Sequence, residues 1–194
     1  MKNEKVNIIR LIIGKAAAFL ILLLLSPFLI LVSIIIFSSS PKENIIFSQI
    51  RVGRNGALFK VYKFRTMTSY EPKEVTRIGR FLRKWKIDEI PMLINVLKGE
   101  MVWVGPRPDI PGYADKLEGE NRKILSQYPG LTCEATLKYR NEEQLLEKQS
   151  DPLWYNDNVI WPDKVKINLE FINKQSFKED IKIIAKTVYV IFFK

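Results

Sequence analysis

The chain has 194 residues, one cysteine and no histidine, and its formal net charge is +10. This length allows one compact domain with a membrane segment, but it excludes two domains of ordinary size. The single cysteine, Cys133, excludes an internal disulfide and favours a reducing compartment, and without histidine the usual general base and the commonest zinc ligand are missing. Any catalysis must therefore rely on carboxylates, Lys, Arg, Tyr or Ser.

The positive charge is concentrated before residue 109. Residues 1–40 carry 4 basic and 1 acidic side chains, residues 41–108 carry 14 and 6, and residues 109–194 carry 13 and 14. A positive field of this kind attracts nucleic acid, anionic lipid or a phosphorylated small substrate, and charge alone does not choose among them. Nucleic-acid binding is disfavoured because the chain has an uncharged apolar run and no recognisable reading element.

Residues 16–37 form an apolar run of 22 residues without a charge, which is long enough to cross the hydrocarbon core of a bilayer. A spanning helix is one interpretation. However, Ser26 and Pro27 interrupt the run in its middle, and basic residues flank it on both sides, which favours a cytoplasmic location for both ends. We therefore expect residues 1–40 to form a re-entrant membrane hairpin that is broken at Ser26-Pro27, with Ser26 bonding a carbonyl that the proline leaves free.

Two further elements are predicted between residues 44 and 85. The segment "NIIFSQIRVGRNGALFKVYKFRTM", residues 44–67, has two β-rich runs around a Gly-Arg-Asn-Gly turn and predicts a β-hairpin. Residues 76–85 predict a basic amphipathic helix with Ile78, Phe81, Leu82 and Trp85 on its apolar face. This helix lies either in the membrane interface or against the core with a solvated basic face, and the membrane run nearby favours the first alternative.

Two adjacent carboxylates, Asp88 and Glu89, stand at the start of a predicted helix that has Asp88 as its N-cap, runs to Leu97 and ends before Gly99. Acidic residues in a first turn complement the helix dipole, so a simple helix cap explains the pair without any chemistry. The following "GPRPDIPG", residues 105–112, is a proline-stiffened loop. Its Arg107 is either a rigid phosphate clamp or part of an ordinary turn.

The remaining chain predicts three more helices. One stops before Pro129-Gly130, and another begins near Pro162. The last follows the capping-box spacing of "SFKE", residues 176–179, and places Ile181, Ile184, Val188 and Phe192 on one face. Together the elements predict one helix-rich α/β domain with a β-hairpin, residues 41–194, joined to the membrane hairpin and carrying amphipathic helices at the membrane interface.

Three segments in this order resemble a known family. They are "FSQIRVGRNGALFKVYKFRTM", "TRIGRFLRKWKIDEIPMLINVLKGEMVWVGPRP" and "YPGLT". The order is similar to that of the bacterial sugar transferases, which are monotopic polyprenol-phosphate phosphoglycosyl transferases. The correspondence is dense from about Phe47 to Pro108 and includes the apolar hairpin with its Ser-Pro break.

The resemblance implies a reaction at the cytoplasmic face of the bacterial inner membrane. A phospho-sugar passes from a UDP-sugar to polyprenol (undecaprenyl) phosphate, giving polyprenol-diphosphate-sugar and UMP. By position in the family motifs, Asp88 is the nucleophile that forms a covalent phospho-sugar intermediate. Glu89 with Asp88 is associated with Mg²⁺. The phosphate-binding and substrate-binding residues that the resemblance implies are Lys63, Arg83, Arg107 and Arg140.

Physical chemistry is compatible with that assignment, because a carboxylate that attacks a diphosphate needs cations to screen the repulsion between two anions. The chain departs from the family after "PGLT", where it has "CEATLKYRN", and at Asn168, where an acidic residue is expected. A non-catalytic, basic, membrane-associated scaffold of a glycan-assembly complex is the alternative function. The sugar, the polyprenol length and the choice between monomer and homodimer are left open by the sequence.

Overall fold

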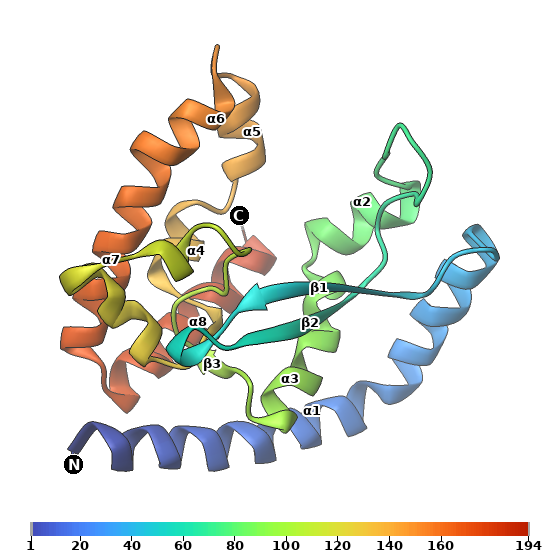
Figure 1. The fold of residues 1–194 in the computed structure, drawn as a ribbon. Coiled ribbons are helices and arrows are strands. Elements are labelled where there is room, and N and C mark those ends of the chain that lie inside the picture. Colours follow the sequence, from blue (N-terminus) through green and yellow to red (C-terminus); the bar gives the residue numbers. More distant parts are fainter. Residues whose placement is uncertain (1, 194) are drawn as a thin grey trace.

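The computed structural model describes residues 2–193. Met1, the first residue of the predicted membrane segment 1–40, and Lys194, the last residue of the predicted domain 41–194, lie outside the described residues. The fold is rich in helices, with two small sheets and a long apolar N-terminal helix along one side (Figure 1). The helices and strands are α1 (Lys2–Ser39), β1 (Ile46–Val52), β2 (Leu58–Phe64), α2 (Arg77–Lys84), α3 (Leu93–Lys98), β3 (Val102–Val104), β4 (Gly130–Thr132), α4 (Glu134–Lys138), α5 (Glu142–Glu147), α6 (Pro152–Tyr155), α7 (Trp161–Lys174) and α8 (Phe177–Phe193).

The helix α1 is continuous through Pro27 and is not interrupted there. Pro27 has no N–H for the carbonyl of Leu23, and the hydroxyl of Ser26 donates to that carbonyl at 2.7 Å (Oγ to O). The expected role of Ser26 is thus confirmed. The helix bends along its second half (Figure 1), so the predicted break is a bend within one helix. A re-entrant path through the membrane stays a prediction.

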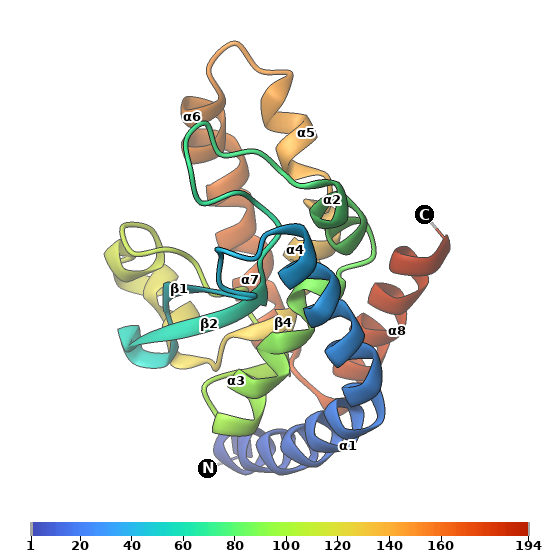
Figure 2. The same ribbon diagram turned by 90° about the vertical axis from the view of Figure 1, so that its right-hand side faces the viewer.

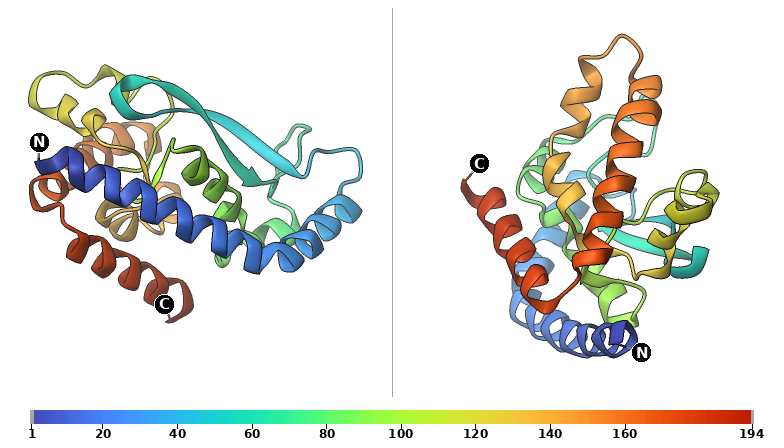
Figure 3. Two further views of the ribbon diagram at one scale, coloured as in Figure 1. Left: turned by 90° about the horizontal axis from the view of Figure 1, so that it is seen from below. Right: turned by 90° about the vertical axis from the view of Figure 1, so that its left-hand side faces the viewer.

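Residues Ile8–Ser39 of α1 are long and apolar enough to cross a membrane by length and composition. Only 11% of the most apolar window in this segment is buried inside the protein. Seen from below, α1 lies on the underside of the molecule with α8 beside it (Figure 3). The ion pair between Arg10 and Asp180 links the two helices, with Nη2 at 3.0 Å from Oδ1.

The predicted β-hairpin is confirmed. β1 and β2 pair antiparallel from Ile46 opposite Phe64 to Val52 opposite Leu58. The turn contains Asn55 at φ 57° and Gly56 at φ 81°, which are the left-handed conformations that the Asn-Gly pair favours. A second, parallel pair joins β3 to β4.

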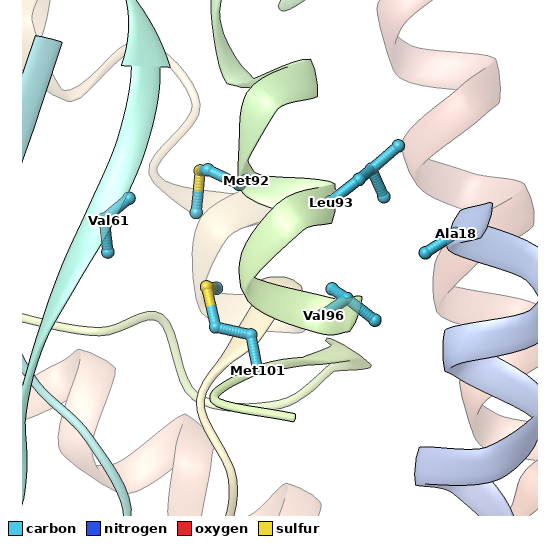
Figure 4. Packing of buried hydrophobic residues seen from close by; sticks show 6 residues of the cluster. All are labelled: Ala18, Val61, Met92, Leu93, Val96 and Met101. Carbon is cyan, nitrogen blue, oxygen red and sulfur yellow. The ribbon is translucent and has the colours of Figure 1, made fainter. Parts of the chain in front are cut away.

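The core around α3 lies between the hairpin and α1 (Figure 4). Met92 and Met101 lie on the side of α3 that faces Val61 of β2, while Leu93 and Val96 lie toward α1. The buried members of this cluster are Ala18, Val61, Met92, Leu93, Val96 and Met101. The packing fixes α3, and the turn that precedes it, relative to both the hairpin and the apolar helix.

The predicted amphipathic helix at residues 76–85 is confirmed as α2, which begins after Thr76, whose side chain accepts a hydrogen bond from Gly79 N. Leu82 packs with Val32, Ile36 and Phe64 against the second half of α1. Phe81, expected on the same apolar face, is instead 53% exposed.

One C-terminal prediction needs correction. The segment before Pro129 is not one α-helix but two 3₁₀ segments, Ala114–Lys116 and Gly119–Ser126. The helix near Pro162 is confirmed as α7. The final helix is confirmed as α8, and its buried residues are Asp180 and Ile183. Of the predicted face, Ile184 packs partly buried against the core, and Ile181, Val188 and Phe192 are exposed. The face predicted from periodicity is therefore mainly exposed, and α8 itself lies at the edge of the molecule (Figure 2).

Candidate active site

The adjacent carboxylates lie on a 3₁₀ turn, Ile87–Met92, that leads directly into α3. Lys86 precedes this turn in the left-handed conformation, at φ 55°, and turns the chain sharply between α2 and the dyad. The helix thus begins at Ile87, so the prediction of Asp88 as its N-cap is wrong. Gly99 follows α3 at φ 79°, as expected for a helix C-terminus.

Glu89 is held by two cations from distant segments. Lys63 on β2 donates from Nζ to Oε1 at 2.9 Å. Arg107, in the loop after β3, donates from Nη2 to Oε1 and from Nη1 to Oε2 at 3.3 Å. Burial acts to raise the pKa of Glu89, but Arg107 and Lys63 outweigh burial and hold the pKa well below its usual value of 4.5. Glu89 is therefore a fixed anion that organises the surrounding cations.

Asp88 has a different environment from its neighbour. It is buried, and its Oδ1 atom has no hydrogen-bond partner within residues 2–193. Burial raises the pKa of the Asp88 carboxyl, and the charge of Glu89 raises it further, whereas Lys63, Lys86 and Arg83 oppose this shift. A buried carboxylate oxygen without a partner is energetically costly, and such groups are typical of reactive positions.

Arg83 approaches the dyad from α2 without contacting it directly. Its Nε donates to Thr66 Oγ1 at 3.0 Å, and its Nη1 lies 3.4 Å from Oε1 of Glu143. The close packing of α2 on the strand end requires Gly79, because a β-carbon there would lie 2.1 Å from the Thr66 carbonyl oxygen. Arg83 thus lies beside Asp88, on which it acts through its charge.

Arg140 lies elsewhere in this structure. Its Nη1 donates to the carbonyl of Val190 in α8 at 2.6 Å. The structure therefore joins Lys63, Arg83 and Arg107 around Asp88 and Glu89, whereas Arg140 joins the segment after α4 to α8. Its role in substrate binding stays a prediction.

Asn95 is a positioning residue that the sequence analysis missed. Its side chain is fully buried on α3, where Nδ2 donates to the Lys60 carbonyl at 2.6 Å and to Glu100 Oε2 at 2.7 Å, while Oδ1 accepts from Tyr62 N at 3.2 Å. These bonds join α3 to β2, the strand that carries Lys63. A lone amide inside the apolar run "MLINVL" is the signal that points to such a role.

The dyad fits a Mg²⁺ ion by the chemistry of its donors. Mg²⁺ is commonly held by one or two carboxylates together with water and substrate phosphates. Asp88 offers a free carboxylate oxygen, and Glu89 is adjacent to it. Among the described residues, no group of three or more His, Cys, Asp or Glu side chains is arranged to hold a metal, so the remaining ligands have to come from substrate and solvent.

The chain is similar to proteins of one known family. The family described as bacterial sugar transferase matches residues 6–194. UDP-glucose:undecaprenyl-phosphate glucose-1-phosphate transferase of Escherichia coli (strain K12) is 35% identical over 192 residues, which cover 89% of this chain and 38% of that protein. Galactosyl transferase CpsE of Streptococcus agalactiae serotype III (strain NEM316) is 34% identical over 169 residues, covering 75% and 34%. The uncharacterized sugar transferase EpsL of Bacillus subtilis (strain 168) is 32% identical over 180 residues, covering 88% and 81%.

The chain belongs to the bacterial sugar transferase family, since the match extends over nearly its whole length. The resemblance found from the motifs is thereby confirmed. The chain spans little more than a third of the length of the Escherichia coli and Streptococcus agalactiae proteins and most of the length of EpsL.

Proposed function

We propose that this chain transfers a phospho-sugar from a UDP-sugar to undecaprenyl phosphate, giving undecaprenyl-diphosphate-sugar and UMP, as the first membrane step of bacterial glycoconjugate assembly. The observation that carries the proposal is the buried Asp88 oxygen without a partner, next to a Glu89 that binds Lys63 and Arg107. Membership of the family and the activity named for the Escherichia coli relative support it. The names of the relatives refer to both glucose and galactose, so the identity of the transferred sugar has to be determined by experiment.

In this proposal Asp88 acts as the nucleophile. One carboxylate oxygen forms a bond to the phosphorus next to the sugar, and the bond between that phosphorus and the bridging diphosphate oxygen breaks, so UMP leaves with the electron pair. A phosphate oxygen of undecaprenyl phosphate then forms a bond to the same phosphorus and displaces the Asp88 carboxylate. An ionised carboxylate needs no general base, which agrees with the absence of histidine.

The surrounding residues reduce the repulsion between Asp88 and an anionic substrate. Arg107 and Lys63 are held in place by Glu89, so their charges are oriented before substrate binds. Arg83 adds a further positive charge close to Asp88. With Asp88 and Glu89 as its protein ligands, Mg²⁺ would supply additional stabilisation of negative charge on the transferring phosphoryl group.

The apolar helix α1 places this site at a membrane surface in the proposal. Its exposed apolar side chains and the cations on both sides of the run favour a monotopic, re-entrant insertion from the cytoplasmic face. The basic helix α2 packs on the second half of α1, so its Arg and Lys side chains are suited to meet anionic headgroups. Undecaprenyl phosphate would then reach Asp88 from the membrane and UDP-sugar from the cytoplasm.

The proposed function is tested by UMP release from a panel of UDP-sugars. Purified protein is supplied with Mg²⁺ and undecaprenyl phosphate, and the wild type is compared with Asp88→Asn. Release by the wild type alone supports the reaction and identifies the sugar. Equal release by both proteins removes Asp88 as the nucleophile, and no release with any donor favours the non-catalytic scaffold.

A further inference from the structure

A buried cation outside the dyad joins the apolar helix to the rest of the protein. Arg10 of α1 is 7% exposed and bonds both oxygens of the Asp180 carboxylate in α8, with Nη2 at 3.0 Å from Oδ1. The same Nη2 also donates to the main-chain carbonyl of Val104, the last residue of β3. One guanidinium group therefore holds two different elements against α1: β3, and the helix α8 that lies beside it (Figure 3).

The next turn of α1 binds the same strand a second time. Trp103 Nε1 donates to the carbonyl of Gly14 at 3.0 Å. The indole ring lies so close to the helix that a β-carbon at Gly14 would be 3.1 Å from Trp103 Cδ1. Two consecutive residues of β3 are thus fixed to α1, Val104 through its main chain and Trp103 through its side chain.

The path from β3 to the dyad is short and closely packed. Only Gly105 and Pro106 separate Val104 from Arg107. Gly105 N donates to the carbonyl of Thr132 in β4 at 3.0 Å, and the Pro106 carbonyl accepts from the first residue of β4 at 2.9 Å. A β-carbon at Gly105 would lie 2.5 Å from a main-chain oxygen just before β4, so the two chain segments are in direct contact. The place of Val104 therefore determines the place from which Arg107 reaches the dyad.

The ion pair with Asp180 does not by itself explain why an arginine stands at residue 10. Taking two charges out of water costs about as much as their attraction returns, so an apolar pair of similar size often holds two helices equally well. A guanidinium group, however, has five donors in a planar fork and can bond a carboxylate and a carbonyl at the same time. The bond to Val104 is the contact that uses this property of Arg10.

We propose that Arg10 is a positioning residue for the donor diphosphate. Through Val104 it sets the place of Arg107, and it thereby couples the seating of the apolar helix to the phosphate site at the dyad. Arg10 acts through Arg107 and touches no substrate itself. The inference rests on the proposed function for the role of Arg107 and for the identity of the donor.

The first test separates positioning from stability. The double variant Arg10→Met/Asp180→Leu removes both buried charges and keeps an apolar contact between α1 and α8, so we expect a melting temperature close to that of the wild type. UDP is titrated calorimetrically with Mg²⁺ present, and we expect about tenfold weaker binding because Arg107 is displaced. Asp180→Asn keeps an acceptor for Arg10 and should give the opposite result, a lower melting temperature with UDP affinity within ~3-fold of the wild type.

A second variant and a matched control support the comparison. Arg10→Lys keeps the charge opposite Asp180 but lacks the planar fork, so it should fold and still bind UDP more weakly than the wild type. Lys15→Met removes a cation from the same helix, at a position next to Gly99 rather than β3. UDP affinity should be unchanged in this control. An equal loss in Lys15→Met would show that only the charge of α1 matters and would overturn the positioning role.

The second test asks whether Arg10 acts through Arg107. UDP affinity is measured for Arg107→Lys with and without the double substitution at Arg10 and Asp180. If Arg10 works by placing the Arg107 guanidinium group, the further loss of affinity shrinks to less than ~3-fold once this group is absent. A further loss of about tenfold would show that the two residues act independently, and it would contradict the proposal.

The two proposals fail in different ways. If the wild type binds UDP but releases no UMP with any donor, the proposed function fails, and the titrations still decide the role of Arg10. If the wild type is active and the double variant binds UDP as tightly as the wild type, only the positioning role fails. If UDP affinity follows the melting temperature across Arg10→Lys, Asp180→Asn and the double variant, Arg10 has a structural role, which also counts against the proposal. A wild type that binds no UDP would count against both proposals.

Discussion

Arg107 and Glu89, 18 residues apart in the chain, form a two-point ion pair in which both guanidinium Nη atoms bond the carboxylate. The pair joins the proline-rich loop after β3 to the turn that carries Asp88. Lys63 binds the same carboxylate from β2, so three segments are held together at one side chain. The anion that organises the cations is thus distinct from the carboxylate that is proposed to react.

Loss of Arg107 is expected to destabilise the protein as well as inactivate it. Arg107→Met leaves the partly buried Glu89 with Lys63 alone, and breaking such a pair costs about 2–4 kcal/mol of the free energy of unfolding. Arg107→Lys keeps the charge but loses the planar two-point geometry, so an intermediate loss is expected. Urea unfolding measures both values. Arg77→Met, on the exposed basic face of α2, is the control, and a loss no larger than in that control would contradict the account.

Acid should weaken the fold through Glu89. Because the folded-state pKa of Glu89 lies below its ordinary value of 4.5, its stabilising contribution is present above pH 4.5 and is lost as the pH falls toward the lower folded-state value. Glu89→Gln removes this contribution. Thermal unfolding between pH 7 and pH 3 should show a steeper acid decline for the wild type than for Glu89→Gln, and parallel curves would refute the ion-pair assignment.

Asp109 should have the opposite pH dependence. Burial raises the pKa of this carboxyl to about 6 in spite of Lys164, Arg51 and Arg107, while Glu142 adds to the increase. A raised pKa means that the charged form disfavours folding, so the contribution of Asp109 to stability falls as the pH rises from about 4 through 6. Asp109→Asn should therefore raise the melting temperature at pH 7.5 and lose this advantage below pH 4. A lower melting temperature at pH 7.5 would show that the charge stabilises the fold.

Labelling should place both ends of α1 on one side of the membrane. Single cysteines are introduced at Asn3 and Lys42 in protein inserted into vesicles, with the buried Cys133 as an internal control for unfolding. If the bend around Pro27 returns the helix, a membrane-impermeant thiol reagent labels both positions only from the cytoplasmic side. Labelling of either position from the opposite side would favour a spanning helix.

The sequence predicted correctly those elements that depend on residues close together in the chain. The Asn-Gly turn and its flanking β-rich runs predicted the hairpin, and the helical spacing of apolar residues in the range 76–85 predicted α2. The Ser26-Pro27 pair predicted a perturbed helix, although Ser26 satisfies the free carbonyl and α1 continues. The start of the dyad helix was misplaced because Lys86 adopts a left-handed conformation that no sequence rule requires, and the 3₁₀ turn that follows it begins at Ile87, one residue before Asp88.

Tertiary packing explains what the sequence could not show. Periodicity placed Ile181, Val188 and Phe192 on one face of the last helix, and this assignment was geometrically sound. The neighbouring face faces inward, where Asp180 pairs with Arg10 and Ile183 packs with Val104 and Phe171. Likewise, the motif resemblance identified Arg107 and Lys63 as phosphate-binding residues. Only the folded structure shows that both bind Glu89, because Arg107 is 18 residues and Lys63 is 26 residues away from Glu89 in the chain.

In the proposed mechanism Asp88 forms a covalent bond to the phospho-sugar, and intact-protein mass spectrometry can detect that bond. Wild-type protein is incubated with Mg²⁺ and the UDP-sugar that supports UMP release, in the absence of undecaprenyl phosphate. We expect a mass increase of one phospho-sugar, located on Asp88 by peptide mapping, absent in Asp88→Asn, and removed when undecaprenyl phosphate is added. A wild type that releases UMP only when undecaprenyl phosphate is present, without any adduct, would instead indicate direct transfer and contradict the nucleophilic role of Asp88.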